Sequence, residues 1–136
     1  MKVILDTSTL IASFAKKSPF RPIYDALLAG KYELVVSNEI LLEYAEKVAE
    51  KTTPSISHNL TELLTVLPNV RLQGIFYHWH IIVSDPDDNK FVDCYVAAGA
   101  DYLVSNDRHF SVLQPGDFPP VQVIGMKEFM GVLARL

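Results

Sequence analysis

The chain has 136 residues, of which 49% are hydrophobic and 21% are charged, and these proportions indicate one ordinary globular domain over residues 1–136. The formal net charge of −4 argues against a broad basic surface for nucleic acid, and the single cysteine, Cys94, excludes an internal disulfide and a cysteine-based zinc cluster. No apolar run reaches the ~20 residues of a membrane span or the roughly 7–15 residues of a signal-peptide core, so we expect a cytoplasmic protein without membrane association.

The first half of the chain alternates short apolar runs with helical patterns. The apolar runs are typical of strands covered on both faces, and apolar residues three or four positions apart predict helices. In chain order, these elements are a strand at 3–5, a helix at 22–28, a strand at 33–36 and a helix at 39–48. Pro22 suits a helix start, and Ser37 or Asn38 can cap the second helix.

The second half continues the same alternation. In chain order, we expect a helix at 54–67, a strand at 70–72, an extended segment at 81–83, a turn at 84–88, a helix up to 98, a strand at 102–104, a loop at 115–120, a strand at 121–124 and a helix at 127–135. Alternation of this kind predicts an α/β fold, with a mainly parallel sheet of about five strands and helices on both faces.

Four acidic residues stand near the points where these predicted strands give way to a helix or loop. They are Asp6, Glu43, Asp88 and Asp107. Functional sites of parallel sheets form beyond the carboxyl ends of the strands, so folding is expected to gather these side chains at one edge. Carboxylates crowded there repel one another unless a cation neutralises them. We therefore expect one or two Mg²⁺ or Mn²⁺ ions, and phosphate chemistry, at this edge.

Hydroxyl and amide groups close to these acids could orient the carboxylates. They belong to Thr7, Ser8, Ser105 and Asn89. Asn89 shares a helix face with Asp93, which we expect to be a fifth acid at the rim of the site.

Each acid also has an ordinary explanation. Asp88 could cap its helix, as could Asp85 or Asp87. Glu43 could lie on a solvated helix face, and Asp107 could be a turn residue. Asp6 is harder to explain in this way, because a carboxylate directly after a buried strand is costly unless it is paired or solvated.

Four segments, taken in order, resemble the PIN-domain family, and in particular PIN proteins described as toxins of prokaryotic toxin–antitoxin pairs. The segments are residues 4–8, 37–43, 85–93 and 99–107. The resemblance implies a three-layer α/β/α sandwich, Mg²⁺- or Mn²⁺-dependent RNA cleavage, homodimers and an antitoxin partner. It also implies an acidic set of Asp6, Glu43, Asp88 and Asp107, with Asp93 as an extra member. Asn106 departs from the pattern, because such relatives often have glycine before the last acid.

The leading hypothesis is an endoribonuclease that cleaves RNA phosphodiester bonds with water activated by the bound ions. Two alternatives remain open. One is a phosphatase with Asp6 as nucleophile, against which Ser8 counts, because such enzymes want a second acid at that position. The other is a non-catalytic PIN-like module that binds RNA or protein.

Two further histidine-containing patterns are weaker. His78 and His80 could share one side of an extended segment, but no third zinc ligand is evident. Arg108 and His109 follow Asp107 and could contact a phosphate, or lie on a loop surface.

Overall fold

The computed structural model describes residues 1–82, 85–113 and 118–136. Its elements follow one another in the order β1 (Lys2–Leu5), α1 (Thr7–Phe14), α2 (Arg21–Leu28), β2 (Glu33–Val36), α3 (Asn38–Lys51), α4 (Pro54–Val66), β3 (Val70–Leu72), η1 (Pro86–Asp88), α5 (Asn89–Ala98), β4 (Tyr102–Val104), η2 (Arg108–Val112), β5 (Val123–Ile124) and α6 (Met126–Ala134), where η denotes a 3₁₀ helix. No helix in these ranges has the length and hydropathy to cross a bilayer.

The five strands form one parallel sheet in the order β3-β2-β1-β4-β5. The chain builds β1, β2 and β3 outward in one direction and then returns to place β4 on the free side of β1. The strand order therefore reverses between β1 and β4. In sheets of this kind, ligands bind beyond the carboxyl ends of the strands at such a reversal.

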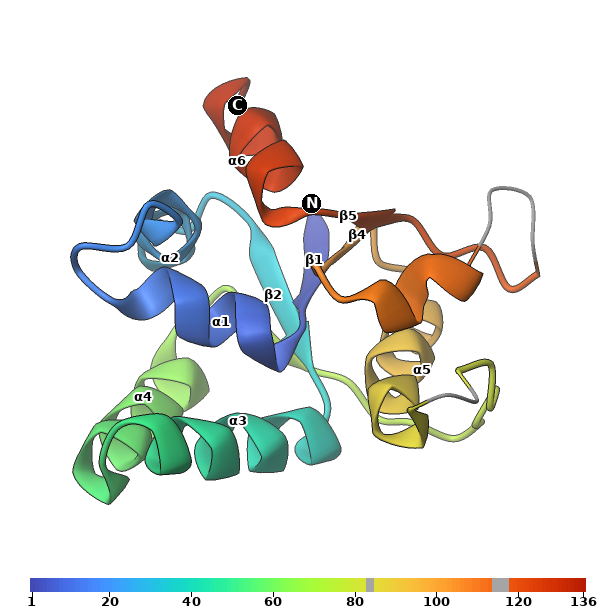
Figure 1. Ribbon diagram of the computed structural model, residues 1–136, viewed down its shortest axis with the longest axis horizontal. Coiled ribbons are helices and arrows are strands. Elements are labelled where there is room, and N and C mark those ends of the chain that lie inside the picture. The colour runs from blue at the N-terminus through green and yellow to red at the C-terminus, as the bar shows by residue number, and fades with distance from the viewer. Residues whose placement is uncertain (83–84, 114–117) are drawn as a thin grey trace.

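Helices cover both faces of this sheet and make an α/β sandwich (Figure 1). Helix α5 packs against β1, β2 and β4, while α1 and α2 lie on the other side of the strands and pack against each other. Helix α6 packs on α2, and α3 packs on α4. Because β1 is covered on both faces, its residues Val3, Ile4 and Leu5 have no exposed surface.

Most of the predicted elements are confirmed. The strands at 33–36, 70–72 and 102–104 have the expected bounds, while the last strand is shorter than 121–124 and comprises only Val123–Ile124. Residues 83 and 84, which belong to the predicted extended segment and turn, and residues 114–117, which include the first half of the predicted loop, lie outside the described residues.

Helix α1 is an element that the sequence prediction lacked. It begins immediately after β1, and Asp6 is its N-cap, with Oδ1 accepting a hydrogen bond from the Thr9 backbone N–H at 2.8 Å. The helix is rich in Thr, Ser and Ile, which have modest helix propensity, and this explains why no helical pattern was evident. Asp6 therefore has a structural role in addition to any chemical one.

Gly99 offers a test of how α5 ends. It adopts a left-handed conformation with φ of 62°, and its N–H is hydrogen-bonded to carbonyls of the last helical turn. We expect Gly99→Ala to lower the free energy of unfolding by about 1 kcal/mol, because a side chain at positive φ is strained.

The matched control is Gly131→Ala inside α6, where an added Cβ meets only the Arg135 side chain at 3.6 Å. There alanine should stabilise the protein by roughly 0.5–1 kcal/mol. Urea denaturation measures both changes, and equal effects of the two substitutions would contradict this account of Gly99.

Candidate metal site

The pairing of β1 with β4 brings together two side chains that are far apart in the sequence. Leu5 lies opposite Val104, and the next N–H, that of Asp6, donates to the Val104 carbonyl at 3.2 Å. Asp6 and Ser105 therefore leave the ends of neighbouring strands side by side, and the Ser105 hydroxyl donates to Asp6 Oδ2. Together with the N–H of Thr9 on Oδ1, this contact fixes the Asp6 carboxylate, which is only 4% exposed.

Ser105 also connects Asp6 to Asp107. The Ser105 hydroxyl oxygen accepts a hydrogen bond from the Asp107 backbone N–H at 2.9 Å, which turns the chain back after β4. Asp107 then caps η2, because its Oδ1 accepts from the His109 N–H at 2.9 Å. One hydroxyl group thus sets the positions of two carboxylates and of the short helix that follows.

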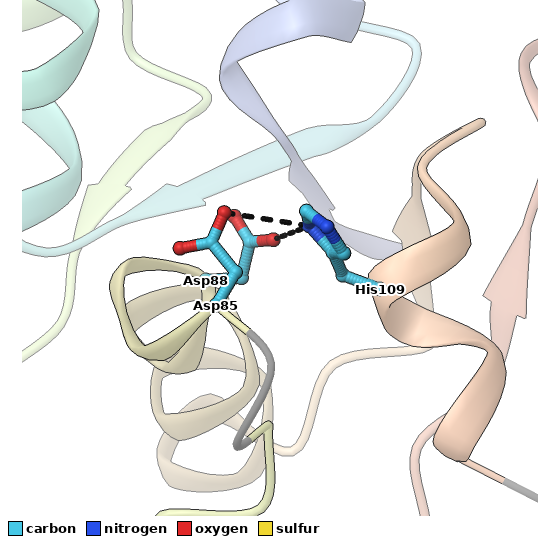
Figure 2. Close-up of side chains that lie close together, drawn as sticks. All are labelled: Asp85, Asp88 and His109. Atoms are coloured by element: carbon cyan, nitrogen blue, oxygen red, sulfur yellow. Dashed lines mark hydrogen bonds and ion pairs between the residues drawn. The ribbon is translucent and has the colours of Figure 1, made fainter.

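A second group of acids faces η2 from the start of α5. Asp85 caps η1 and Asp88 ends it, and side chains three residues apart lie on the same side of a 3₁₀ helix. Figure 2 shows both carboxylates directed toward the imidazole of His109. His109 Nδ1 lies 2.9 Å from Asp88 Oδ2, 3.1 Å from Asp107 Oδ1 and 3.4 Å from Asp85 Oδ2. The imidazole therefore joins the acids that follow β4 to those that precede α5.

Glu43 reaches the same region from α3. The Tyr44 hydroxyl donates to the Leu5 carbonyl at 2.5 Å, which ties α3 to the end of β1. The adjacent Glu43 then accepts a hydrogen bond from the Thr7 hydroxyl through Oε2 and lies 2.7 Å from Lys90 Nζ through Oε1. Glu43 thus contacts the residue after Asp6 and a residue in the first turn of α5.

Burial and mutual repulsion change the protonation of these groups. Burial raises the pKa of Asp88 to about 6, and the charges of Asp85 and Asp107 add to this effect, while the hydrogen bond from His109 opposes it. Burial also raises the pKa of Asp6, against hydrogen bonds from Ser105 and Thr9. The bond to Asp88 in turn raises the pKa of His109. The neighbouring side chains therefore only partly offset the negative charge of these carboxylates.

The residues present fit a hard divalent cation. Among the described residues, no lysine or arginine pairs with Asp6, Asp88 or Asp107, and only Glu43 has such a partner. Carboxylate oxygens are the ligands that Mg²⁺ and Mn²⁺ take in proteins. Asp85, Asp88 and His109 each offer a donor atom within 4.8 Å of the others.

The structure links three of the four predicted acids through short contacts, because Asp6, Asp107 and Asp88 are joined through Ser105 and His109. Glu43 contacts Thr7, the residue after Asp6, and Lys90, two residues after Asp88. Among the described residues, the donor atoms that all lie within 4.8 Å of one another belong to Asp85, Asp88 and His109, so the four predicted acids do not form such a group by themselves. Their roles as metal ligands stay predictions.

Three of the supporting residues lie in other surroundings than predicted. Ser8 is exposed, and the side chain of Asn89 bonds to the backbone N–H and carbonyl of Ile82 instead of orienting a carboxylate. Asp93 is buried and turned toward residues 78–79, where its oxygens contact His78 Nδ1 at 3.1 Å and the Trp79 N–H at 2.9 Å. Both oxygens of Asp93 thus contact other protein groups, and its role as an extra ligand stays a prediction.

Asp85, His109 and Lys90 are members of the site that the sequence analysis did not assign to it. The sequence predicts Asp85 only as a helix cap, and His109 as a phosphate contact or a loop-surface residue. For Asp85 and His109, the one signal in the sequence is spacing. Asp85 lies three residues before Asp88, and His109 lies two residues after Asp107. That spacing acquires meaning only once η1 and η2 are known to be 3₁₀ helices.

Asn106 and Cys94 contribute to the fold. Asn106 stands in place of the glycine common in the relatives, and it does not need a positive φ. Its Oδ1 accepts from the Met126 N–H at 2.9 Å and so caps the start of α6. Cys94, on α5, is buried.

Comparison with known proteins agrees with this architecture. A family model described as the PIN domain matches residues 2–109. Among solved structures, the chain is similar to a chain of VapBC2 from Rickettsia felis bound to a DNA fragment from its promoter, with a TM-score of 0.64 and 15% identity over 92% of this chain and 98% of that chain. It is also similar to a chain of DNA-bound VapBC from Salmonella typhimurium, with a TM-score of 0.61 and 16% identity over 93% and 98%. No curated protein matches the sequence.

The raised pKa of Asp88 has a consequence for stability. A carboxyl whose pKa is 3.8 in the unfolded chain and about 6 in the folded one holds its proton more tightly when folded, so its contribution to stability falls as the pH rises from about 4 to about 6. Without divalent cations near pH 7, we expect Asp88→Asn to be more stable than the natural chain by roughly 1 kcal/mol, allowing for solvent screening.

Thermal denaturation in EDTA between about pH 4 and pH 8 tests this expectation. The two proteins should converge at the acidic end. Glu50→Gln, which removes an exposed acid from α3, is the control and should show no such gain at neutral pH. A less stable Asp88→Asn at pH 7 would mean that the charged carboxylate favours the fold.

Proposed function

This chain belongs to the PIN-domain family, and from that premise we propose that it is a divalent-metal-dependent endoribonuclease, the toxin of a prokaryotic toxin–antitoxin pair, acting in the cytoplasm. The observation that supports this proposal is the chain of contacts that connects Asp6, Asp107 and Asp88 at the reversal of strand order, with no lysine or arginine paired with any of the three among the described residues.

In this proposal, Asp6, Asp88 and Asp107 hold one or two Mg²⁺ or Mn²⁺ ions, and Glu43 ligates an ion or orients water. A divalent ion in such a site supplies Lewis-acid activation of water and neutralises developing charge on phosphate. Neighbouring groups of the protein orient these carboxylates. Ser105 and Thr9 hold Asp6 in one orientation, and Thr7 and Lys90 do the same for Glu43.

A hollow beside the acids is the candidate path for RNA. It is lined by Glu39, His78, His80, Pro86, Asp87, Asn89, Lys90 and Asp93. Two imidazoles and an ammonium group can donate hydrogen bonds to phosphate oxygens. The same lining carries the carboxylates of Glu39, Asp87 and Asp93, and Lys90 is paired with Glu43, so RNA bound here would need cations in addition to these donors.

We further propose an antitoxin partner and a homodimer. The two similar solved structures are VapBC complexes by their descriptions, and this supports the partner proposal for a chain of the same fold. A basic side chain of the antitoxin would complement the acidic edge and so compete with the cation.

A non-catalytic RNA- or protein-binding module is the second candidate. It is favoured by the ion pair of Lys90 with Glu43 and by the imidazole placed among three carboxylates, because both offset charge that a metal would otherwise offset.

The Asp6→Asn variant separates these candidates. Asparagine caps a helix as well as aspartate does, so α1 should remain folded, while loss of a charged ligand should reduce Mg²⁺- or Mn²⁺-dependent cleavage of single-stranded RNA by at least about 100-fold. Cleavage is measured on a labelled RNA, with circular dichroism as the check on folding.

The control for that experiment is Asp25→Asn, the same chemical change on α2 at a residue that pairs with Arg21. It should cleave like the natural chain. Undiminished cleavage by a folded Asp6→Asn protein would refute the assignment of Asp6, and no cleavage by the natural chain with either ion would favour the binding module.

A further inference from the structure

We propose that His109 is a direct ligand of the cation, and that with Asp85 and Asp88 it makes a mixed nitrogen–oxygen site that takes Mn²⁺ in preference to Mg²⁺. The inference rests on the proposed metal dependence of the same edge of the sheet. It adds two ligands, Asp85 and His109, to the acidic set and specifies the metal.

The distances among the donor atoms carry this proposal. Ligand atoms that are neighbours on an octahedral ion at about 2.1 Å are themselves about 3.0 Å apart. His109 Nδ1 lies 2.9 Å from Asp88 Oδ2 and 3.4 Å from Asp85 Oδ2. The three donor atoms all fall within 4.8 Å of one another, so one ion can contact all of them with small adjustments (Figure 2).

The backbone that carries the imidazole is held in place by hydrogen bonds. The His109 N–H donates to Asp107 Oδ1, and Asp107 is in turn positioned by Ser105. Ligands of a metal need this kind of support, because an ion gains little from a side chain that must first be ordered. The side chains of His109 and Asp85 are 40% and 38% exposed, so an ion can enter from solvent.

Nitrogen in the ligand set determines the preferred metal. Mg²⁺ strongly favours oxygen ligands and gives up its waters reluctantly, whereas divalent transition ions accept imidazole readily. Two carboxylates with one imidazole therefore favour Mn²⁺ over Mg²⁺, and Co²⁺ should bind at least as well as Mn²⁺ by the usual order of affinities.

A competing explanation treats His109 as a cation that neutralises Asp85, Asp88 and Asp107 in place of a metal. The two explanations predict opposite effects on metal affinity when His109 is removed. If His109 is a ligand, its removal weakens metal binding, and if it is a competing charge, its removal strengthens metal binding.

Isothermal titration of the purified full chain with Mn²⁺ and with Mg²⁺ distinguishes them. Titration at about pH 8 lessens the competition between protons and the metal for this imidazole, whose pKa is raised by its hydrogen bond with Asp88. We expect His109→Ala to weaken Mn²⁺ binding by about tenfold or more and Mg²⁺ binding by less, which removes the preference for Mn²⁺. His58→Ala is the matched control, because His58 is an exposed histidine of α4 that pairs only with Glu62 among the described residues, and it should leave both affinities unchanged.

Two additional measurements make the assignment independent of RNA cleavage. The visible absorption spectrum of bound Co²⁺ should change in His109→Ala, because a nitrogen ligand has been lost, and Asp85→Asn should also weaken Mn²⁺ binding. Unchanged or tighter Mn²⁺ binding by a folded His109→Ala protein would overturn the proposal. If that result accompanied loss of cleavage in Asp6→Asn, the nuclease would stand without this ligand. If instead Asp6→Asn cleaved RNA fully while His109→Ala bound Mn²⁺ more weakly, His109 would stand as a ligand and the nuclease assignment of Asp6 would fail.

Discussion

Hydrogen bonds between β1 and β4 align Leu5 with Val104, and the positions of the site residues depend on this pairing. It sets Asp6 beside Ser105, and Ser105 then directs Asp107 and η2 toward the start of α5. The strands are parallel and fully covered, so their register is determined by packing on both faces and cannot shift without exposing apolar side chains. The arrangement of acids at the edge of the sheet is thereby supported by the buried strands β1 and β4.

The negative charges of the acids at this edge are offset in three different ways. Glu43 has a lysine, Asp85, Asp88 and Asp107 share an imidazole, and Asp6 has only hydrogen bonds from a hydroxyl and a backbone amide. The raised pKa values of Asp6 and Asp88 show that these offsets are incomplete. Proteins commonly sacrifice stability at functional sites, and surplus charge of this kind is one form that the sacrifice takes.

Much of the architecture was predictable from local pattern, because wholly apolar runs such as residues 3–5 have few other uses in a chain of this composition. The positions of the acids suggested a group, since Asp6 and Asp107 lie just beyond strands, Asp88 begins a helix, and Glu43 lies in the second turn of the helix after β2. The strand order could not be predicted, because it depends on which long-range pairing buries most surface. Helix α1 could not be predicted, because its threonines and serines have modest helix propensity and leave no clear apolar pattern after Asp6. Asp85 and His109 were missed because their approach depends on two 3₁₀ turns, and such turns leave no apolar periodicity.

The long separation between Asp6 and Ser105 has a consequence for synthesis of the protein. The two residues lie 99 positions apart, and a ribosome adding roughly 5–20 residues per second needs on the order of 5–20 s to make that stretch. Throughout this interval, a nascent chain has β1 and Asp6, and can pair β1 with β2, but it lacks β4 and the Ser105 hydroxyl that orients Asp6. The acidic arrangement at this edge is therefore among the last features that translation completes, and any chemistry that depends on it must wait until β4 has been made.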